Sequence, residues 1–190
     1  MKKESKHAEE EKLVALAKQD RKYFKPLYEK YFDTIFWFVL KRTGSEAVSG
    51  DIAQQVFFKA MINLKKYRSM GHPFSSWLYR IALNEVNQYY RKTKHRRYVE
   101  IDENQVQDLT DEIEFDEEVN PDPSKLLSKL LEVLAPDELS IIEMKYFEQK
   151  TFREIGEILS LTESATKVRA HRIMKKLRNT VNQVSAQTNT

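Results

Sequence analysis

Cysteine is absent from this 190-residue chain, which excludes disulfides and thiolate-bound metals and favours a reducing compartment. Long hydrophobic runs are also missing, and the longest one, Thr34 to Leu40, is far too short to cross a bilayer. The chain starts with MKKESKHAEEEK, which contains no apolar stretch of the kind that a secretory signal needs. We therefore expect a cytoplasmic protein without a membrane span.

Residues that build catalytic and cofactor sites are equally scarce. Four glycines leave little for a phosphate-cradling loop, and the four histidines, at 7, 72, 95 and 171, show no metal-ligand spacing. Many of the carboxylates are concentrated in one connecting segment. The sequence therefore predicts neither an enzyme nor a cofactor or metal site.

Charge is abundant, and it is segregated along the chain. Residues 1–99 carry a net charge of +11, residues 100–123 contain no Lys or Arg and carry −11, and residues 124–190 carry +3. The acidic segment ends in Asn120-Pro121-Asp122-Pro123, where each proline interrupts regular structure. We expect two basic folded domains, 1–97 and 124–181, an acidic flexible linker at 98–123 and a disordered tail at 182–190.

The N-terminal domain is predicted to be helical throughout. Apolar residues recur at helical spacing through Glu9–Lys18, Arg21–Arg42 and Ile52–Lys66, and no alternating strand pattern competes. Gly44 is expected to stop the second of these helices, and Asp51 is expected to cap the third.

The C-terminal domain is predicted to hold four short helices that begin at Lys125, Glu138, Phe152 and Glu163. The last two are joined by the tight turn Leu159-Ser160-Leu161-Thr162, which is the arrangement of a helix-turn-helix. The fold class is therefore all-α, with two small helical domains joined by an acidic linker. The residues expected to pack the helix-turn-helix are Ile155, Ile158, Leu161, Val168 and Ile173.

Aromatic rings, amides and guanidinium groups are interleaved in the segment FSSWLYRIALNEVNQYYRKTKHRR, residues 74–97. Such a mixture suits a surface that stacks on bases and neutralises phosphates. Counted from Trp77, the offsets +3, +7, +11 and +14 place Arg80, Asn84, Gln88 and Arg91 on one stripe. Core packing is the alternative for the rings, and for Trp77 it is the stronger one.

Two more helical faces carry candidate binding residues. Four polar and aromatic residues share one helical face, at positions i, i+3, i+4 and i+7: Asp51, Gln54, Gln55 and Phe58. The face is either a surface that binds a partner, or an ordinary one with solvated amides and a Phe ring enclosed by its neighbours. The cation-rich helix 163–178, ~24 Å long, can lie in a major groove, although a solvated basic helix has the same composition.

The segment TFREIGEILSLTESATKVRAHRIMKKLRN resembles region 4 of bacterial extracytoplasmic-function (ECF) sigma factors, a group of the sigma-70 family. Glu154-Ile155, Ile158-Leu159 and the basic residues from Lys167 to Arg178 match the family pattern in register. A buried Thr at position 166 needs a hydrogen-bond partner, for which the carbonyl one turn back is a candidate. The departures from the pattern are Gly156 for Ala, Ser164 for Gly, and Ala165-Thr166 for Thr-Val. The resemblance implies −35 promoter contacts from Ser164, Ala165, Lys167, Arg169, His171, Arg172 and Lys175.

The segments DIAQQVFF, residues 51–58, and 74–97 resemble region 2 of the same family, in the right order. By this resemblance the first grips the clamp helices of the RNA polymerase β′ subunit, with Gln55 standing where the family usually has Glu. The second melts the −10 promoter element and holds its non-template strand, with Asn84 as the best candidate to bind the edge of a flipped base. The implied polymerase-binding residues are Asp51, Gln54, Gln55 and Phe58, and the implied −10 residues are Gly71, His72, Phe74, Trp77, Arg80, Asn84, Gln88 and Arg91.

The main hypothesis is thus an ECF sigma factor whose partners are core RNA polymerase, through the β′ clamp helices and the β subunit, and promoter DNA. In related sigma factors the linker threads into the basic polymerase cleft, although its acidity also suits a soluble, extended connector. Many family members are held by an anti-sigma factor, which would cover these same surfaces. The rival from another class is a free-standing helix-turn-helix regulator, which needs neither of the two region 2 surfaces. An enzyme acting on nucleic acid is a third hypothesis, which the composition disfavours.

Overall fold

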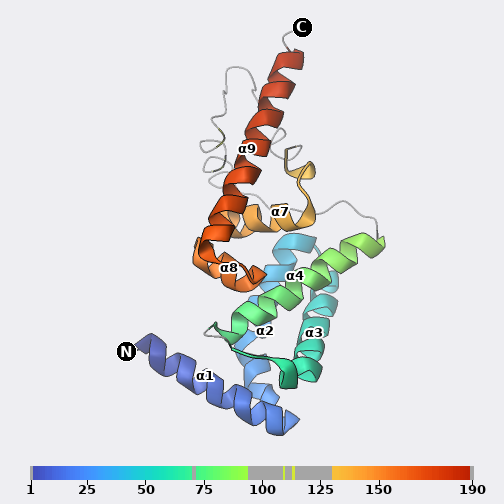
Figure 1. Ribbon diagram of the computed structural model, residues 1–190. Helices are drawn as coiled ribbons and strands as arrows, with labels where there is room; N and C mark the ends of the chain where they lie inside the picture. Colours follow the sequence, from blue (N-terminus) through green and yellow to red (C-terminus); the bar gives the residue numbers. More distant parts are fainter. Residues whose placement is uncertain (1, 70–71, 94–108, 110–112, 114–129, 189–190) are drawn as a thin grey trace. The chain divides into compact units, whose positions relative to one another are not determined.

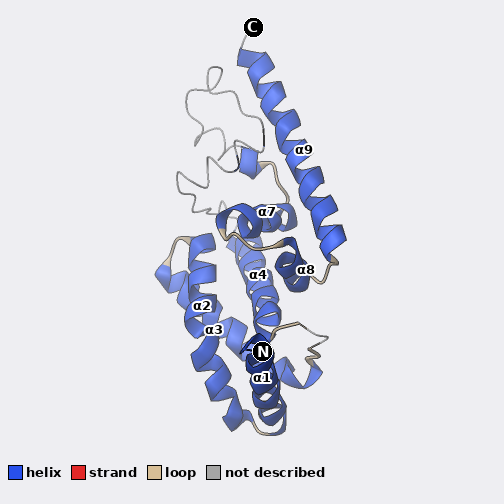
Figure 2. Ribbon diagram, turned by 90° about the vertical axis from the view of Figure 1, so that its left-hand side faces the viewer, coloured by secondary structure: helices blue, strands red, loops and turns tan. Residues whose placement is uncertain are grey.

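The computed structural model describes residues 2–69, 72–93, 109, 113 and 130–188. Tertiary contacts divide the chain into two compact units, Met1–Glu100 and Ile101–Thr190, each of which is described by itself (Figure 1). The described residues form helices and no strands, as Figure 2 shows, and this confirms the all-α prediction. The linker predicted at 98–123 lies outside the described residues except for Leu109 and Ile113, which are helical and buried.

The described residues of the first unit form four helices and two short 3₁₀ turns. Where the sequence predicted one helix over Arg21–Arg42, the structure has a 3₁₀ turn followed by a helix. Pro26 lies in the first turn of that helix, where its missing N–H costs no intrahelical hydrogen bond. Gly44 ends the helix as predicted, with φ of 64° and its N–H bonded to the Leu40 carbonyl at 2.8 Å. The elements are α1 (Lys2–Gln19), a 3₁₀ turn (Arg21–Phe24), α2 (Lys25–Thr43), α3 (Glu46–Asn63), a second 3₁₀ turn (Leu64–Lys66) and α4 (Phe74–Thr93).

Helix α3 begins well before Asp51. Ser45 precedes the helix in an extended conformation, and its hydroxyl accepts a long hydrogen bond from Val48 N at 3.5 Å. The prediction that Asp51 caps this helix is therefore wrong, because Ser45 provides an earlier cap. Asp51 lies within α3 instead, with its side chain exposed.

Helices α2, α3 and α4 pack against one another around a continuous apolar core. The ends of α2 and α4 are tied together by the Tyr90 hydroxyl, which donates to the Arg42 carbonyl at 2.7 Å. Arg42 itself is buried, and its guanidinium lies 3.7 Å from the centre of the Phe38 ring. The fully buried apolar residues of this core include Leu27, Ile35, Val39, Ala53, Val56, Leu78, Ala82 and Val86.

The second unit contains α7 (Pro136–Ile142), a π-helical turn (Glu143–Phe147), α8 (Phe152–Leu159) and α9 (Glu163–Thr188). Helix α9 continues to Thr188, so the prediction of a disordered tail from residue 182 is wrong as far as the described residues extend. No Gly or Pro follows Arg178, and Val181 is buried, so the sequence contains no signal that ends the helix there.

Local hydrogen bonds fix the turn between α8 and α9. At the start of α8, Thr151 N donates to the Glu154 carboxylate at 2.8 Å, and Glu154 N donates back to the Thr151 hydroxyl at 3.2 Å. Ser160 adopts the left-handed conformation, with φ of 58°, and ends α8. At the start of α9, the Thr162 hydroxyl accepts a hydrogen bond from Ala165 N at 3.1 Å. The predicted helix-turn-helix is therefore present, and a threonine hydroxyl caps the start of each of its helices.

Gly156 and Thr166, two departures from the family pattern, meet in this turn. Thr166 is fully buried, and its hydroxyl donates to the Thr162 carbonyl at 2.9 Å, which confirms the hydrogen bond expected from the sequence. A Cβ atom on Gly156 would lie 2.7 Å from the Leu161 carbonyl oxygen and 3.1 Å from the Thr166 hydroxyl. Helices α8 and α9 therefore pack so closely at Gly156 that an alanine side chain does not fit there without a shift of the backbone.

Replacing Gly156 with alanine is expected to destabilise the second unit by about 1–2 kcal/mol, because the cost of moving the Leu161 carbonyl exceeds the gain in helix propensity. The matched control is Gly50→Ala in α3, where an added Cβ would meet nothing within 4 Å. That substitution is expected to stabilise the first unit by up to about 1 kcal/mol. Hydrogen exchange detected by mass spectrometry measures the stability of each unit separately. If Gly156→Ala and Gly50→Ala changed the stability of their units in the same direction, this interpretation would be contradicted.

Candidate polymerase and promoter interfaces

The outward side of α3 carries the predicted polymerase-binding residues. Asp51, Gln54, Gln55 and Phe58 are all exposed, and Phe58 keeps 52% of its surface accessible. Ile62, one turn beyond Phe58, is 47% exposed and extends the apolar part of this side. Sequence reasoning missed Ile62, although its i+4 spacing from Phe58 is the signal that identifies it. We call these five residues the α3 face.

The stripe predicted on α4 is present on the side of the helix that faces away from the core. Asn84 and Arg91 are exposed, whereas Arg80 and Gln88 are half-buried. Burial lowers the pKa of Arg80 from its ordinary value. The opposite side of α4 is held in the core, and Glu85 binds Lys59 of α3 at 2.7 Å. We call Arg80, Asn84, Gln88 and Arg91 the α4 stripe.

Four other residues are predicted to contact the −10 element, and the three that the structure describes have different surroundings. Phe74 is only 1% exposed and packs among the rings of Tyr31, Tyr67 and Trp77, so its side chain belongs to the core and is not placed to contact DNA. Trp77 is half-buried in the same cluster, in line with its interpretation as a core residue. His72 is exposed, and Gly71 lies outside the described residues.

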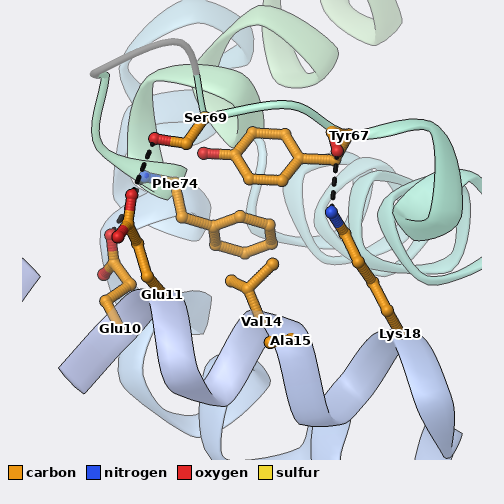
Figure 3. A pocket seen from close by; sticks show the side chains of 8 residues that line it. All are labelled: Glu10, Glu11, Val14, Ala15, Lys18, Tyr67, Ser69 and Phe74. Carbon is orange, nitrogen blue, oxygen red and sulfur yellow. Dashed lines mark hydrogen bonds between the residues drawn. The ribbon is translucent and has the colours of Figure 1, made fainter. Parts of the chain in front are cut away.

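A cavity of about 200 Å³ lies between α1 and the loop that joins the second 3₁₀ turn to α4 (Figure 3). Val14 of α1 and the ring of Phe74 line its apolar side. Polar contacts flank it, because the Ser69 hydroxyl donates to Glu11 at 3.1 Å and Lys18 Nζ donates to the Tyr67 carbonyl at 2.8 Å. Helix α1 therefore holds the loop that precedes the α4 stripe at both of these points.

Glu10 joins α1 to α2 and to the start of α4. Its carboxylate, only 5% exposed, accepts hydrogen bonds from Lys30 Nζ at 2.7 Å, from the Tyr31 hydroxyl, and from Phe74 N at 3.0 Å. The first N–H groups of a helix have no partner within it, so this carboxylate caps α4 from a different helix. Burial raises the pKa of Glu10, but the three hydrogen bonds outweigh it and leave the pKa below its ordinary value. Burial likewise raises the pKa of Tyr67 to about 12.

Replacing Glu10 with glutamine is expected to lower the free energy of unfolding of the first unit by about 1–2 kcal/mol at pH 7, because Lys30 loses its charged partner. The wild-type carboxylate has a lower pKa in the folded chain than its ordinary value of 4.5, so its contribution is present above that pH and is lost as the pH falls below it. The difference between wild type and variant should therefore shrink on acidification.

The difference in the free energy of unfolding between wild type and variant is measured by chemical denaturation at pH 7 and at pH 3.5. Hydrogen exchange monitors the unfolding of the first unit separately. The control is Glu9→Gln, a neighbouring exposed residue, which is expected to have little effect at either pH. A Glu10→Gln effect that is independent of pH would show that the carboxylate charge is not what stabilises the unit.

Helix α9 presents the predicted −35 residues on its accessible side. Two of its lysines form ion pairs of 2.7 Å, Lys167 with Glu163 and Lys176 with Glu138 of α7, and these hydrogen bonds lower the pKa of both glutamates. Val168, which was expected to pack in the core, is 50% exposed, and that prediction is wrong. Ser164, Lys167, Arg169, His171, Arg172 and Lys175 are exposed, Ala165 is half-buried, and the opposite side is buried through Thr166, Ala170, Ile173 and Leu177.

Across the described part of the chain, no group of three or more His, Asp or Glu side chains is placed to hold a metal ion. Within the same residues, every helix is too short or too polar to cross a membrane.

Two family models match the chain, one in each unit. Sigma-70 region 2 matches residues 27–96, and Sigma-70, region 4 matches residues 130–179. The chain is also 27% identical over 175 residues to the ECF RNA polymerase sigma factor SigW of Bacillus subtilis (strain 168), an alignment that covers 88% of this chain and 93% of the relative. The chain belongs to the ECF group of the sigma-70 family.

Further comparisons agree with an ECF sigma factor. RNA polymerase sigma factor YlaC of the same Bacillus subtilis strain is 28% identical over 155 residues, which covers 80% of this chain and 88% of the relative. The solved structure of CnrH in complex with the cytosolic domain of CnrY matches with a TM-score of 0.54 at 18% identity, and the match covers 92% of this chain and 97% of the matched chain. At that identity the likeness concerns the fold.

As an ECF sigma factor, the protein is a transcription initiation factor and not an enzyme. It binds core RNA polymerase and directs it to promoter DNA. A free-standing helix-turn-helix regulator would have no use for region 2, so the match over residues 27–96 excludes that alternative.

Proposed function

We propose that this ECF sigma factor distributes promoter recognition and opening over three of its surfaces. The α3 face binds the clamp helices of the polymerase β′ subunit. Its polar residues Asp51, Gln54 and Gln55 form hydrogen bonds there, while Phe58 and Ile62 supply apolar contact area. Gln55 stands where the family usually has Glu, so a neutral contact replaces an ion pair at that point of the interface.

The α4 stripe receives the non-template strand of the −10 element once the duplex has opened. Asn84, exposed at the middle of the stripe, can donate and accept at once, so it is suited to the Watson–Crick edge of a flipped base. Arg80 and Arg91 lie on either side of it and neutralise phosphates. Trp77 and Phe74 support this surface from within the core.

Helix α9 lies in the major groove of the −35 element. Ser164 and Arg172 face base edges, while Lys167, Arg169 and Lys175 reach phosphates along the groove. Residues up to about 97 thus act as region 2 and residues 124–181 as region 4, in the cytoplasm, where polymerase and promoters meet. A protein regulator that covers the α3 face or the α4 stripe would keep the factor inactive.

The observation that carries this proposal is the exposure of Asn84 between two guanidinium groups on a helix whose other side is core. The test uses a promoter obtained by selecting random DNA for run-off transcripts made by core polymerase with this chain. A photo-crosslinking amino acid at Gln88 is expected to label the non-template −10 strand, and the same amino acid at Lys175 is expected to label the −35 duplex.

Crosslinkers at Glu29 of α2 and at Gln149, which precedes α8, serve as controls and are expected to label neither element. Labelling of the −35 duplex from Gln88, or of the −10 strand from Lys175, would overturn the proposed division of roles.

A further inference from the structure

Val168 occupies an unusual place on the recognition helix α9. Its side chain is 50% exposed, and the other exposed residues around it on α9 are polar or cationic. Single exposed apolar residues are common on protein surfaces, so exposure by itself assigns no role. What distinguishes Val168 is its direction relative to the buried side of the helix.

Successive residues of an α-helix are separated by about 100° around its axis. On α9 the buried residues Thr166, Ala170, Ile173 and Leu177 define one side, and Val168 lies on the opposite side, pointing directly away from it. Ser164 and Arg172, one turn before and one turn after, lie on the same side as Val168.

The two cations that adjoin Val168 in sequence point to either side of it. Lys167 and Arg169 lie about 100° to either side of Val168 around the helix axis. When α9 lies in the major groove, these two side chains point toward the walls of the groove. Val168 therefore takes the position nearest the floor of the groove, where base edges are displayed, while the lysine and the arginine are placed for phosphates.

The chemistry of valine limits what it can bind at that position. Its side chain has no donor or acceptor, and the only apolar group on the major-groove edges of the four base pairs is the 5-methyl group of thymine. A β-branched residue in a helix has one strongly preferred rotamer, so little conformational entropy is lost when the side chain meets a base. We propose that Val168 is a specificity-determining residue that contacts the 5-methyl group of a thymine in the −35 element.

This inference rests on the proposed role of α9 in the −35 duplex. It is tested with the complete chain in complex with core polymerase and with the selected promoter, by replacing each thymine of the −35 element in turn with uracil. The exchange removes one methyl group and leaves all hydrogen-bonding groups in place. At one thymine, the wild-type complex is expected to bind the uracil promoter about threefold to fivefold more weakly.

The Val168→Ala variant is expected to bind both promoters equally at that position, and Val168→Ile is expected to restore the preference for thymine. Val133→Ala is the matched control, because Val133 is an exposed valine of the same unit, at 45%, that lies outside α9. It should keep the full thymine-to-uracil ratio.

Three results overturn the proposal: no thymine of the element is sensitive to uracil, Val168→Ala keeps the wild-type ratio, or Val168→Ala weakens binding to core polymerase while the DNA preference is unchanged. The last result would place Val168 in a protein interface. If the wild-type complex protects no upstream duplex at all, the proposed role of α9 fails. If it protects the upstream duplex but the binding does not depend on any thymine methyl group, only the role of Val168 fails.

Discussion

Replacing Phe58 with alanine is expected to weaken the binding of this sigma factor to core RNA polymerase by about thirtyfold or more. Phe58 is the largest side chain of the α3 face and is 52% exposed in the folded chain. Truncation of a large aromatic residue at the centre of an interface costs about 2 kcal/mol or more, which corresponds to this loss of affinity. Because the ring is exposed, the substitution should leave the stability of the first unit nearly unchanged.

Titration of fluorescently labelled chain with purified core polymerase measures the effect. Tyr23→Ala is the matched control, since Tyr23 is an aromatic residue of the same unit, 39% exposed, that lies outside the α3 face. If Phe58→Ala binds as tightly as the wild-type chain, the α3 face is not the principal polymerase contact.

Replacing Asn84 with alanine is expected to reduce the population of opened promoter complexes by about tenfold to a hundredfold, while binding to core polymerase stays unchanged. When a flipped base in a desolvated pocket loses its hydrogen-bond partner, the complex is destabilised by about 1–3 kcal/mol. Asn84 is exposed on the outer side of α4, so its loss leaves no buried group unpaired in the free protein. The variant should also discriminate less between bases at the captured position.

The reactivity of unpaired thymines toward permanganate measures opening, and the titration described for Phe58 measures polymerase binding. Asn179→Ala, an exposed asparagine on α9, is the control for the loss of a surface amide. A loss of polymerase binding in Asn84→Ala would mean that α4 contacts the enzyme at this position and not the DNA.

The features that could be predicted from the sequence are those whose signals act within a few residues. Thr151 with Glu154 begins α8, Thr162 begins α9, and Gly44 ends α2, each through a hydrogen bond to a residue three or four positions away. The same local logic gave a wrong start for α3, because Ser45 and Asp51 are both good capping residues and only the structure distinguishes them.

The errors among the candidate site residues arise where a side chain's direction depends on tertiary packing. Phe74 begins α4 but turns into the core, because rings from α2 and from the loop surround it. Val168 precedes the buried Ile173 by five residues, about 140° around α9, so the two side chains do not share a side of the helix and Val168 points away from the core.

The network around Glu10 could not be predicted from the sequence. Its partners Lys30, Tyr31 and Phe74 lie 20, 21 and 64 residues away along the chain, and a glutamate in a charged N-terminal helix gives no sign of burial. Ile62 is the opposite case, because extending the i+4 pattern of the α3 face by one step would have found it.

Permanganate footprinting of the selected promoter, with core polymerase and either the wild-type chain or Asn84→Ala, tests the capture of the opened strand by α4 most directly. The wild-type chain is expected to make thymines of the −10 element reactive. Asn84→Ala is expected to keep the upstream protection and to lose most of that reactivity. Equal reactivity with both chains, alongside an unchanged footprint, would contradict the role assigned to the α4 stripe.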